Sequence, residues 1–376
     1  MRELQEIRNE IDEVDRQFVE LYLRRMGLTG QVAAYKIANG KKVFDKAREQ
    51  EKLASIQAMV ETPFEKKGVR ELFEHLMSMS RKRQYQMLLE KGVSQKLPFC
   101  PVDELPKENV RIVFQGEEGA YAQMAMQQYF ENTTGSYHVR TWRDAMEAIA
   151  KGEADYAVLP IENSSAGIVS ENYDLLVEYD NCIVGEQIIP IRHCLLGLPE
   201  SSLDTVTQVY SHPQALMQCG RYLEEHRDWE KHSTINTAGA AKKVQEEAAV
   251  HQAAIASSLT ADIYGLKILD DDIADNPGNC TRFVIVSGKK MFVRDAGKIS
   301  ICFEIPHASG TLYHMLSHFI FNDLNMNKIE SRPLGERNWE YRFFIDFEGN
   351  LQDGAVQNAL QGLMEEAENL KILGNY

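Results

Sequence analysis

The chain has 376 residues, of which 44% are hydrophobic and 26% are charged. This length exceeds one ordinary domain and the composition is typical of a globular protein, so two to four domains are expected. The formal net charge of −15 argues against non-specific binding to nucleic acid or to anionic membranes, because such binding needs a basic face. Any anionic ligand must therefore be held by local arginines and lysines.

No signal for export or for a membrane span is found in the sequence. The N-terminus, MRELQEIRNEIDEVD, lacks the apolar core of a signal peptide, and no stretch approaches the roughly 18 apolar residues of a membrane helix. The six cysteines form no CxxC pair, so neither a zinc site nor a disulfide framework is indicated. A cytoplasmic location with reduced thiols is expected, and no metal or cofactor is predicted.

Residues 1–90 are predicted to form an all-helical domain. Helical periodicity runs through this segment, which contains no proline before Pro63. The first helix is expected to reach about Ala38, where Asn39-Gly40 stops it, the second to begin near Asp45, and the third to follow Pro63. Residues 91–109 contain three prolines without periodicity and are predicted to be a linker.

Apolar residues of the first helix recur at alternating spacings of four and three, at Ile7, Ile11, Val14, Phe18, Leu21, Leu28, Val32 and Tyr35. This spacing predicts the buried seam of a packed helix. Arg25 occupies the middle of the seam, where a charge costs several kcal/mol unless an opposite charge meets it. We therefore expect Arg25 to hold an anion.

Two further cations lie on the same helix. Arg25 and Lys36 are eleven residues apart, so they point the same way about 16 Å apart along the axis and can converge on one ligand. Arg8 lies about 25 Å from Arg25 along this helix, which is too far for both to grip one small molecule. If all three serve one site, Arg8 must come from a second chain, and the protein must be at least a dimer.

Other polar residues of the helical segment pair at the i,i+4 spacing, namely Asp45 with Glu49 and Ser80 with Gln84. Taken singly, each could be an ordinary solvated residue on a helix surface. Together the set resembles the active site of the all-helical chorismate mutases, and it comprises Arg8, Arg25, Lys36, Asp45, Arg48, Glu49, Ser80 and Gln84. The resemblance implies that the arginines hold the two carboxylates of chorismate.

The same resemblance implies roles for the remaining residues. Lys36 and Gln84 would donate to the ether oxygen as catalytic residues, and the region of Asp45 and Glu49 would orient the ring hydroxyl. The Claisen rearrangement of chorismate to prephenate needs only a compact conformer and stabilisation of the charge that develops on the breaking ether. Cations and amide donors supply both, and no nucleophile or cofactor is required.

Residues 110–290 are predicted to form a two-lobed α/β domain. Short apolar runs such as VRIVFQG and DYAVLPIEN alternate with amphipathic helices, which indicates a parallel sheet with covering helices. The segments from IVGEQIIPIRHCLLGL onward would supply the second lobe. TRFVIVSG is expected to be a last strand that returns to the first lobe.

Three polar motifs adjoin these strands, PIENSSAG at 160–167, SHPQALMQCG at 211–220 and NCTRFVIVSG at 279–288. Ligands of α/β domains bind beyond the carboxyl ends of strands, although each motif alone could be an ordinary cap, loop or strand start. A fourth, QGEEGAYA at 115–122, puts Gly116 and Gly119 before a helix whose N-terminus could hold a carboxylate. In this order the motifs resemble prephenate dehydratase. The glycine motif departs from the family, with Ala120 and Gln123 where serine and histidine are common.

Prephenate dehydratase removes carbon dioxide and hydroxide from prephenate to give phenylpyruvate. The resemblance implies that Thr281 polarises the leaving hydroxyl, as a positioned hydrogen-bond donor rather than a bulk acid. It further implies a set of substrate-binding and supporting residues: Glu162, Asn163, Ser164, Ser211, His212, Gln214, Gln218, Arg282 and Phe283.

Residues 298–376 are predicted to form a ferredoxin-like βαββαβ domain. This segment resembles the ACT domain of the same enzymes, where phenylalanine binds at subunit interfaces and inhibits. Glu330, Ser331, Arg332 and Pro333 match one effector-binding signature, while Gly310, Thr311, Leu312 and Tyr313 stand where Gly-Ala-Leu-Val is usual. Thr and Tyr are larger and more polar, so weaker or altered phenylalanine binding is expected. A purely structural dimerisation domain is the alternative.

The resemblance covers nearly the whole chain and implies a bifunctional chorismate mutase/prephenate dehydratase of phenylalanine biosynthesis. Its substrates would be chorismate and prephenate, its allosteric effector phenylalanine, and its assembly a homodimer or higher oligomer. The alternative is a non-catalytic sensor that binds a small acid and carries a helical dimerisation arm.

Overall fold

The computed structural model describes residues 2–93, 96–131, 134–334 and 340–376. The chain divides into two units, of which the first combines Met1–Pro98 with Gly297–Lys371 and the second combines Phe99–Ala296 with Ile372–Tyr376. Among the described residues no helix combines the length and apolar character that crossing a membrane requires.

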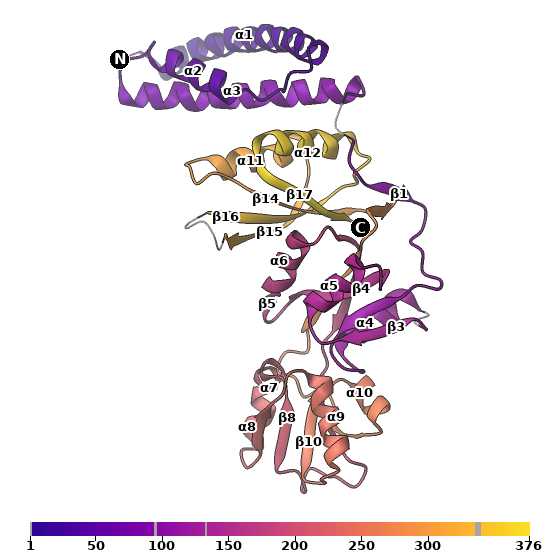
Figure 1. Cartoon of the computed structure of the whole chain (residues 1–376). Coiled ribbons are helices and arrows are strands. Elements are labelled where there is room, and N and C mark those ends of the chain that lie inside the picture. Colours follow the sequence, from indigo (N-terminus) through magenta and orange to yellow (C-terminus); the bar gives the residue numbers. More distant parts are fainter. Residues whose placement is uncertain (1, 94–95, 132–133, 335–339) are drawn as a thin grey trace. The chain divides into compact units, whose positions relative to one another are not determined.

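The helical part of the first unit contains α1 (Leu4–Ala38), α2 (Lys46–Gln57) and α3 (Pro63–Glu90), which confirms the three predicted helices (Figure 1). The helix starts follow from local chemistry. The Asp45 side chain caps α2 by accepting from the Arg48 N–H. Thr62 and Glu65 form a capping box at the start of α3, with Pro63 at the first helical turn.

The apolar seam of α1 is exposed in the single chain. The prediction that this seam is buried is therefore wrong for the single chain. Residues 2–21 are all exposed, with Val14 at 62% and Leu21 at 63%. The buried residues of α1 are Thr29 and Ala33 in its second half, where it packs on α3. Periodicity identifies the face that needs cover, but it does not identify what covers it.

The C-terminal module (residues 298–375) has the predicted βαββαβ order, and it belongs to the first unit except for the end of its last strand from Ile372 onward. Its elements are β14 (Lys298–Glu304), α11 (Thr311–Phe321), β15 (Met326–Pro333), β16 (Tyr341–Glu348), α12 (Gly354–Glu366) and β17 (Glu368–Asn375). The strand order is β15-β16-β14-β17, with β16 antiparallel to both β14 and β15. Helices α11 and α12 lie side by side over these strands, and α12 packs against α3 of the helical part (Figure 1).

The first lobe of the second unit alternates strands and helices, as predicted for the segment that begins at 110. They are β2 (Ile112–Gln115), α4 (Tyr121–Phe130), β3 (Ser136–Val139), α5 (Trp142–Ala150), β4 (Tyr156–Asn163), β5 (Gly167–Ile168), α6 (Ser170–Glu178), β6 (Cys182–Pro190) and β12 (Cys280–Ser287). The strand order is β6-β12-β4-β2-β3. Gly374, near the C-terminus, pairs with Ile183 of β6.

The sheet of the first lobe is mixed, whereas a parallel sheet was predicted. Strand β2 runs parallel to β3 and β4, but β12 is antiparallel to both β4 and β6. The reason is topological, because β12 returns from the second lobe and enters between two strands that leave in the opposite direction. The predicted return of this strand to the first lobe is confirmed.

The second lobe is a smaller sheet of order β11-β7-β10-β8-β9. Its elements are β7 (Cys194–Gly197), β8 (Gln208–Ser211), α7 (Pro213–Gln218), α8 (Gly220–Glu225), β9 (Glu230–Ser233), α9 (Thr237–Glu247), β10 (Gln252–Ala256), α10 (Ser258–Tyr264) and β11 (Lys267–Asp270). Leu195, Val209 and Ile255 are fully buried in its core. Two chain crossings, after β6 and after β11, join the lobes.

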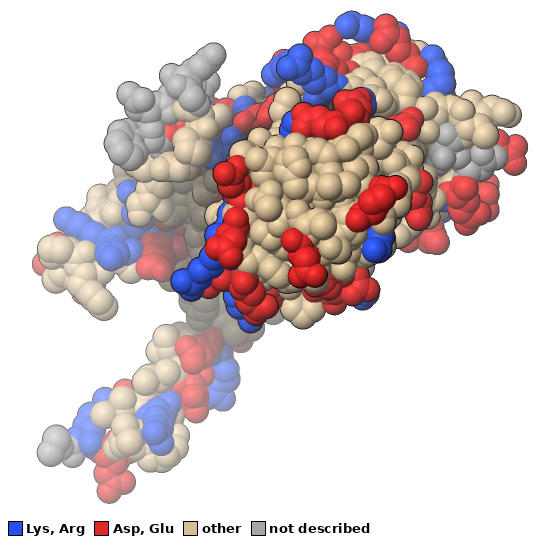
Figure 2. Space-filling view, turned by 90° about the horizontal axis from the view of Figure 1, so that it is seen from below, with Lys and Arg blue, Asp and Glu red and all other residues tan. Residues whose placement is uncertain are grey.

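Part of the predicted linker is ordered structure. Cys100–Val102 form β1, which pairs in parallel with β13 (Met291–Val293), and the Cys100 N–H donates to the Lys290 carbonyl at 2.9 Å. On the face that Figure 2 shows, acidic and basic side chains are interspersed and no broad basic patch is visible, in keeping with the negative net charge.

Candidate active sites

A cavity of about 260 Å³, the helical cavity, lies among α1, α2 and α3. Seven of the eight residues predicted for the mutase site line it: Arg25, Lys36, Asp45, Arg48, Glu49, Ser80 and Gln84. Arg8 does not line the cavity and belongs to the exposed first half of α1. One chain therefore brings together the predicted set without Arg8.

Arg25 is half-buried at the wall of the helical cavity. Its Nη1 donates to the Leu76 carbonyl at 3.0 Å and to the Ser80 hydroxyl, and Ser80 in turn donates to the Leu76 carbonyl at 2.8 Å. Burial lowers the pKa of Arg25. Because both partners are neutral oxygens, the guanidinium keeps its charge available for an anionic ligand.

Lys36 and the polar residues opposite it are held by their own contacts. The Lys36 Nζ donates to the Val43 carbonyl at 2.5 Å, and burial lowers the pKa of Lys36 while Asp45 and Glu365 oppose this. Gln84 donates to the Ser80 carbonyl at 3.2 Å. Its Oε1 is buried and has no hydrogen-bond partner among the described residues, so it can serve a ligand.

Arg81 also lines the helical cavity, and sequence reasoning missed it. Its Nη1 donates to both carboxylate oxygens of Glu49 at 2.6 Å. The sequence signal that could have identified Arg81 is its position next to Ser80, in the basic run Arg81-Lys82-Arg83 of a helix. Such a run is usually exposed to solvent. Only the fold reveals that Arg81 is buried, with 6% of its surface exposed.

A second cavity of about 460 Å³, the interlobe cavity, lies between the two lobes of the second unit. Six of the residues predicted for the dehydratase site line it: Asn163, Thr281 and Phe283 from the first lobe and His212, Gln214 and Gln218 from the second. The first three come from β4 and β12, and the others from α7 and its N-cap.

Thr281 and Asn163 face each other across paired strands of the first lobe. The Asn163 Nδ2 donates to the Thr281 Oγ1 at 2.9 Å. The Asn163 Oδ1 accepts from the N–H groups of Ser165 and Ala166 at 3.0 and 2.9 Å, which fixes the orientation of the amide. Because the Thr281 oxygen already accepts a hydrogen bond, its O–H is directed to donate elsewhere.

Glu162 and Arg282 do not line the interlobe cavity. They are the strand neighbours of Asn163 and Thr281, and successive side chains of a strand point to opposite faces. On the other face Arg282 lies 3.7 Å from Glu162 and 3.3 Å from Glu186. This ion-pair cluster braces β4, β12 and β6 from behind the cavity.

Two predicted serines also lie outside the lining. The Ser164 hydroxyl accepts from the Cys280 N–H at 3.0 Å and donates to the Asn279 Oδ1 at 3.3 Å. Ser211 is fully buried and donates to the Ile255 carbonyl at 2.6 Å. The structure thus gives both serines roles in shaping the chain around the cavity, and their predicted contact with substrate stays a prediction.

Sequence reasoning missed several polar residues of the interlobe cavity. His193 connects Tyr121 and Gln218, with Nδ1 3.1 Å from the Tyr121 hydroxyl and Nε2 3.0 Å from the Gln218 Oε1. Burial lowers the pKa of His193, which favours the neutral imidazole. The indole N–H of Trp142 is buried without a hydrogen-bond partner among the described residues. The sequence signal that could have identified His193 is its position just after β6, where the chain passes from the first lobe to the second.

Comparison with known proteins identifies the two segments of the chain that contain these cavities. The family model for chorismate mutase type II matches residues 7–85, and that for prephenate dehydratase matches residues 112–291. The bifunctional chorismate mutase/prephenate dehydratase of Escherichia coli K12 is 31% identical over 98% of this chain and 95% of its own length. The chain belongs to the bifunctional chorismate mutase/prephenate dehydratase family. It is accordingly an enzyme with a mutase segment around the helical cavity and a dehydratase segment around the interlobe cavity.

Solved structures match about 70% of this bifunctional enzyme, which is more than the dehydratase segment alone. Prephenate dehydratase from Arthrobacter aurescens, in complex with L-Phe, is 31% identical with a TM-score of 0.66, and the match covers 71% of this chain and 89% of that one. GqqA, described as a novel type of quorum quenching acylase, is 32% identical with a TM-score of 0.64, covering 70% and 96%. The fold of this part is therefore shared by proteins with different described activities.

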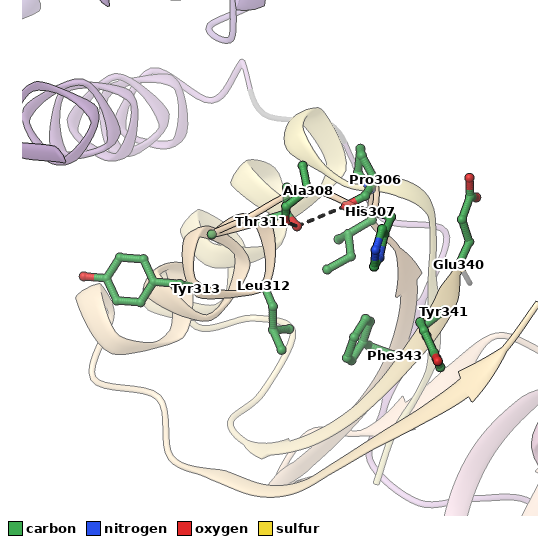
Figure 3. A pocket seen from close by; sticks show the side chains of 11 residues that line it. Pro306, His307, Ala308, Thr311, Leu312, Tyr313, Glu340, Tyr341 and Phe343 are labelled. Carbon is green, nitrogen blue, oxygen red and sulfur yellow. Dashed lines mark hydrogen bonds between the residues drawn. The ribbon is translucent and has the colours of Figure 1, made fainter. Parts of the chain in front are cut away.

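A third hollow of about 360 Å³ lies in the C-terminal module of the bifunctional enzyme (Figure 3). All four residues of the first predicted effector signature line it: Gly310, Thr311, Leu312 and Tyr313. Gly310, the N-cap residue of α11, adopts a φ of 85°, which favours glycine. The second signature, Glu330 to Pro333, lies on β15 and does not line this hollow.

Figure 3 shows that the side chains of Thr311, Leu312 and Tyr313 point in different directions. Leu312 and Phe343 point toward each other across the hollow, whereas Tyr313 points away and is 58% exposed. The Thr311 hydroxyl is used within its own loop, where it donates to the carbonyls of Pro306 and Ala308 at 3.0 and 2.8 Å. The hollow therefore offers a mainly apolar wall.

Proposed function

We propose that the helical cavity converts chorismate to prephenate and that the interlobe cavity converts prephenate to phenylpyruvate, as part of phenylalanine biosynthesis. The observation that carries the proposal is the Asn163–Thr281 pair at 2.9 Å, which orients one hydroxyl toward a ligand-sized cavity. Convergence of seven predicted mutase residues on one cavity supports the first step independently.

In the helical cavity, Arg25 would bind a carboxylate of chorismate, and Lys36 and Gln84 would contact the ether oxygen. The Claisen rearrangement breaks that C–O bond while a C–C bond forms, so negative charge develops on the oxygen. Pre-positioned cations stabilise this charge without reorganisation. Asp45, Arg48, Glu49 and Ser80 complete the polar wall.

In the interlobe cavity, the Thr281 hydroxyl would donate to the ring hydroxyl of prephenate as it departs. The C–O bond and the C–C bond to the ring carboxylate break together, and one proton is taken up to release water and carbon dioxide. Gln218 and His212 would position the substrate from the opposite lobe. The neutral His193 is suited to hydrogen bonding rather than to charge pairing.

Two parts of the proposal need a second chain. Arg8 would enter the helical cavity from a partner subunit, and the exposed apolar seam of α1 supports such an association. Phenylalanine would bind the hollow beside Leu312 as an inhibitor, with Glu330 to Pro333 of another subunit closing it in the manner of an ACT domain. The complex of the Arthrobacter protein with L-Phe supports this effector. The cytoplasmic location stays a prediction.

The test is direct. Purified full-length protein is mixed with chorismate, and the loss of chorismate absorbance and the appearance of phenylpyruvate are followed with and without phenylalanine. Turnover of chorismate and of prephenate is expected. Binding of either acid without turnover would favour the non-catalytic sensor instead.

A further inference from the structure

Helix α3 carries two buried cations next to the helical cavity. Within the run Arg81-Lys82-Arg83, Arg81 is 6% and Lys82 is 1% exposed, whereas Arg83 faces solvent. A buried charge is stable only when opposite charges and hydrogen bonds satisfy it. The partners of Arg81 and Lys82 therefore reveal what this part of α3 is built against.

Arg81 joins two carboxylates from different parts of the first unit. Its Nη1 holds both oxygens of Glu49, which lines the helical cavity, while its Nε and Nη2 donate to Glu366 at 2.7 and 3.0 Å. Glu366 is the last residue of α12, and its side chain is 4% exposed. A residue of the C-terminal module thus reaches the cavity wall through one guanidinium.

The contact between Arg81 and Glu366 is an ion pair. Burial alone would lower the pKa of Arg81, but the carboxylates of Glu366 and Glu49 outweigh it and raise the pKa. Burial alone would raise the pKa of Glu366, but His318 and Arg81 beside it lower the pKa to about 2. The arrangement is a fixed ionic bridge rather than a loose surface contact.

Glu365 makes a second connection to the same wall. It accepts from the Phe44 N–H at 2.8 Å and lies 3.4 Å from the Tyr85 hydroxyl. Phe44 precedes the cap Asp45, and its ring lies 5.0 Å from the Arg81 guanidinium. Glu365 therefore holds the short segment that contains Val43, whose carbonyl accepts a hydrogen bond from the Lys36 Nζ.

Helix α11, which begins at the hollow of Figure 3, takes part in the same contact. The Lys82 Nζ donates to the Ser317 hydroxyl at 3.0 Å. His318 is fully buried 3.3 Å from Glu366. It packs so closely on Gly362 of α12 that a Cβ there would lie 2.3 Å from its ring. Movement of α11 would consequently disturb Glu366.

We propose that Arg81 is a positioning residue for Glu49 in the mutase site, and that Glu365 and Glu366 of the C-terminal module position the cavity wall through Phe44 and Arg81. The helical cavity is then complete only while α12 packs on α3. This inference rests on the proposed mutase function of the cavity. It makes the C-terminal module a part of the mutase, so that a ligand of α11 acts on the helical cavity as well.

The physical reason is the geometry required for rearrangement. Without the Glu366 carboxylate, one side of the Arg81 guanidinium loses its charged, two-oxygen acceptor, and the side chain is free to turn into the cavity that it lines. Glu49 would then lose its fixed orientation. Displacements of about 1 Å at such positions can cost on the order of 100-fold in rate.

The first experiment is a double-mutant cycle in the full-length protein. Glu366→Gln, Glu49→Gln and the double variant are assayed for mutase kcat and KM, and for dehydratase activity on the same preparations. We expect Glu366→Gln to lower mutase kcat about tenfold and dehydratase activity less than twofold. If Glu366 acts through Glu49, the double variant loses no more than Glu49→Gln alone. Glu90→Gln, which alters the exposed Arg83 pair at 3.4 Å, is the matched control and should change neither activity.

The second experiment separates positioning from simple stability. The double substitution Arg81→Met with Glu366→Met replaces a buried ion pair with apolar side chains, an exchange that is often neutral or stabilising. Positioning predicts a folded protein with normal dehydratase activity and mutase kcat still reduced about tenfold. Arg83→Met with Glu90→Met is the control.

Recovery of full mutase activity in the Arg81/Glu366 double variant would overturn the inference, as would independent, multiplying losses in the Glu366/Glu49 cycle. Failure of the proposed function looks different, because the unaltered protein would then not consume chorismate at all.

Discussion

The two candidate active-site cavities are lined by side chains of different chemistry. The helical cavity is lined by charges, among them Arg25, Lys36 and Arg81, and it takes part of its support from the C-terminal module. The interlobe cavity offers mainly neutral donors such as Thr281 and Gln218, and the residues that line it all lie between Gln115 and Phe283, outside the C-terminal module. A rearrangement that only needs charge stabilised can be built from cations, whereas an elimination needs a positioned hydrogen-bond donor.

Because different residues line the two cavities, we expect that the mutase and dehydratase activities can be lost separately. Arg25→Ala removes one of the cations that line the helical cavity, and we expect mutase turnover to fall roughly 100-fold or more while dehydratase activity stays near normal. Steady-state assays with chorismate and with prephenate measure the two rates. Arg24→Ala, one residue earlier and exposed, is the control. Equal loss of both activities in Arg25→Ala would contradict separate sites.

Thr281 provides the reverse test. Thr281→Val keeps the shape but removes the hydroxyl, and we expect dehydratase turnover to fall on the order of 100-fold with the mutase unchanged. Thr281→Ser keeps the donor and should retain most of the activity. A fully active Thr281→Val enzyme would remove this hydroxyl from the mechanism.

The α1 seam tests whether only the helical cavity depends on association. Val14→Glu introduces a charge at the apolar face, so we expect weaker association and mutase activity about tenfold lower on dilution, since Arg8 is lost from the site. Dehydratase activity should not depend on dilution in this way. Val19→Glu, about 140° round the helix, is the matched control. Sedimentation and mutase activity are measured over the same concentration series. A protein that is monomeric and still has full mutase activity would refute the role of Arg8.

Local signals predicted much of this fold. The cap at Asp45, the capping box of Thr62 with Glu65 and the periodicity of α1 to α3 are contained in a few neighbouring residues, so helix bounds could be inferred. The alternation rule could also have separated Asn163 from Glu162, because adjacent residues of a strand face opposite ways.

Long-range contacts could not be predicted in the same way. Arg81 and Glu366 are 285 positions apart, and nothing in the local pattern distinguishes a buried arginine from a solvated one. The mixed sheet depends likewise on where β12 enters, which is a property of the chain path. The apolar seam of α1 is exposed because no other described residue of this chain packs against its first half, and the periodicity of the helix gives no information on this point.

The smallest effect concerns the effector hollow. The sequence predicts weaker phenylalanine binding because Tyr313 is larger than the valine that is usual at this position. The Tyr313 side chain, however, points out of the hollow (Figure 3). We therefore expect Tyr313→Val to shift the phenylalanine concentration for half inhibition less than twofold. Leu312→Ala, which removes apolar contact inside the hollow, should shift it about tenfold. Phenylalanine titration of dehydratase activity measures both, and a larger shift for Tyr313→Val than for Leu312→Ala would mean that the effector binds on the outer face of α11.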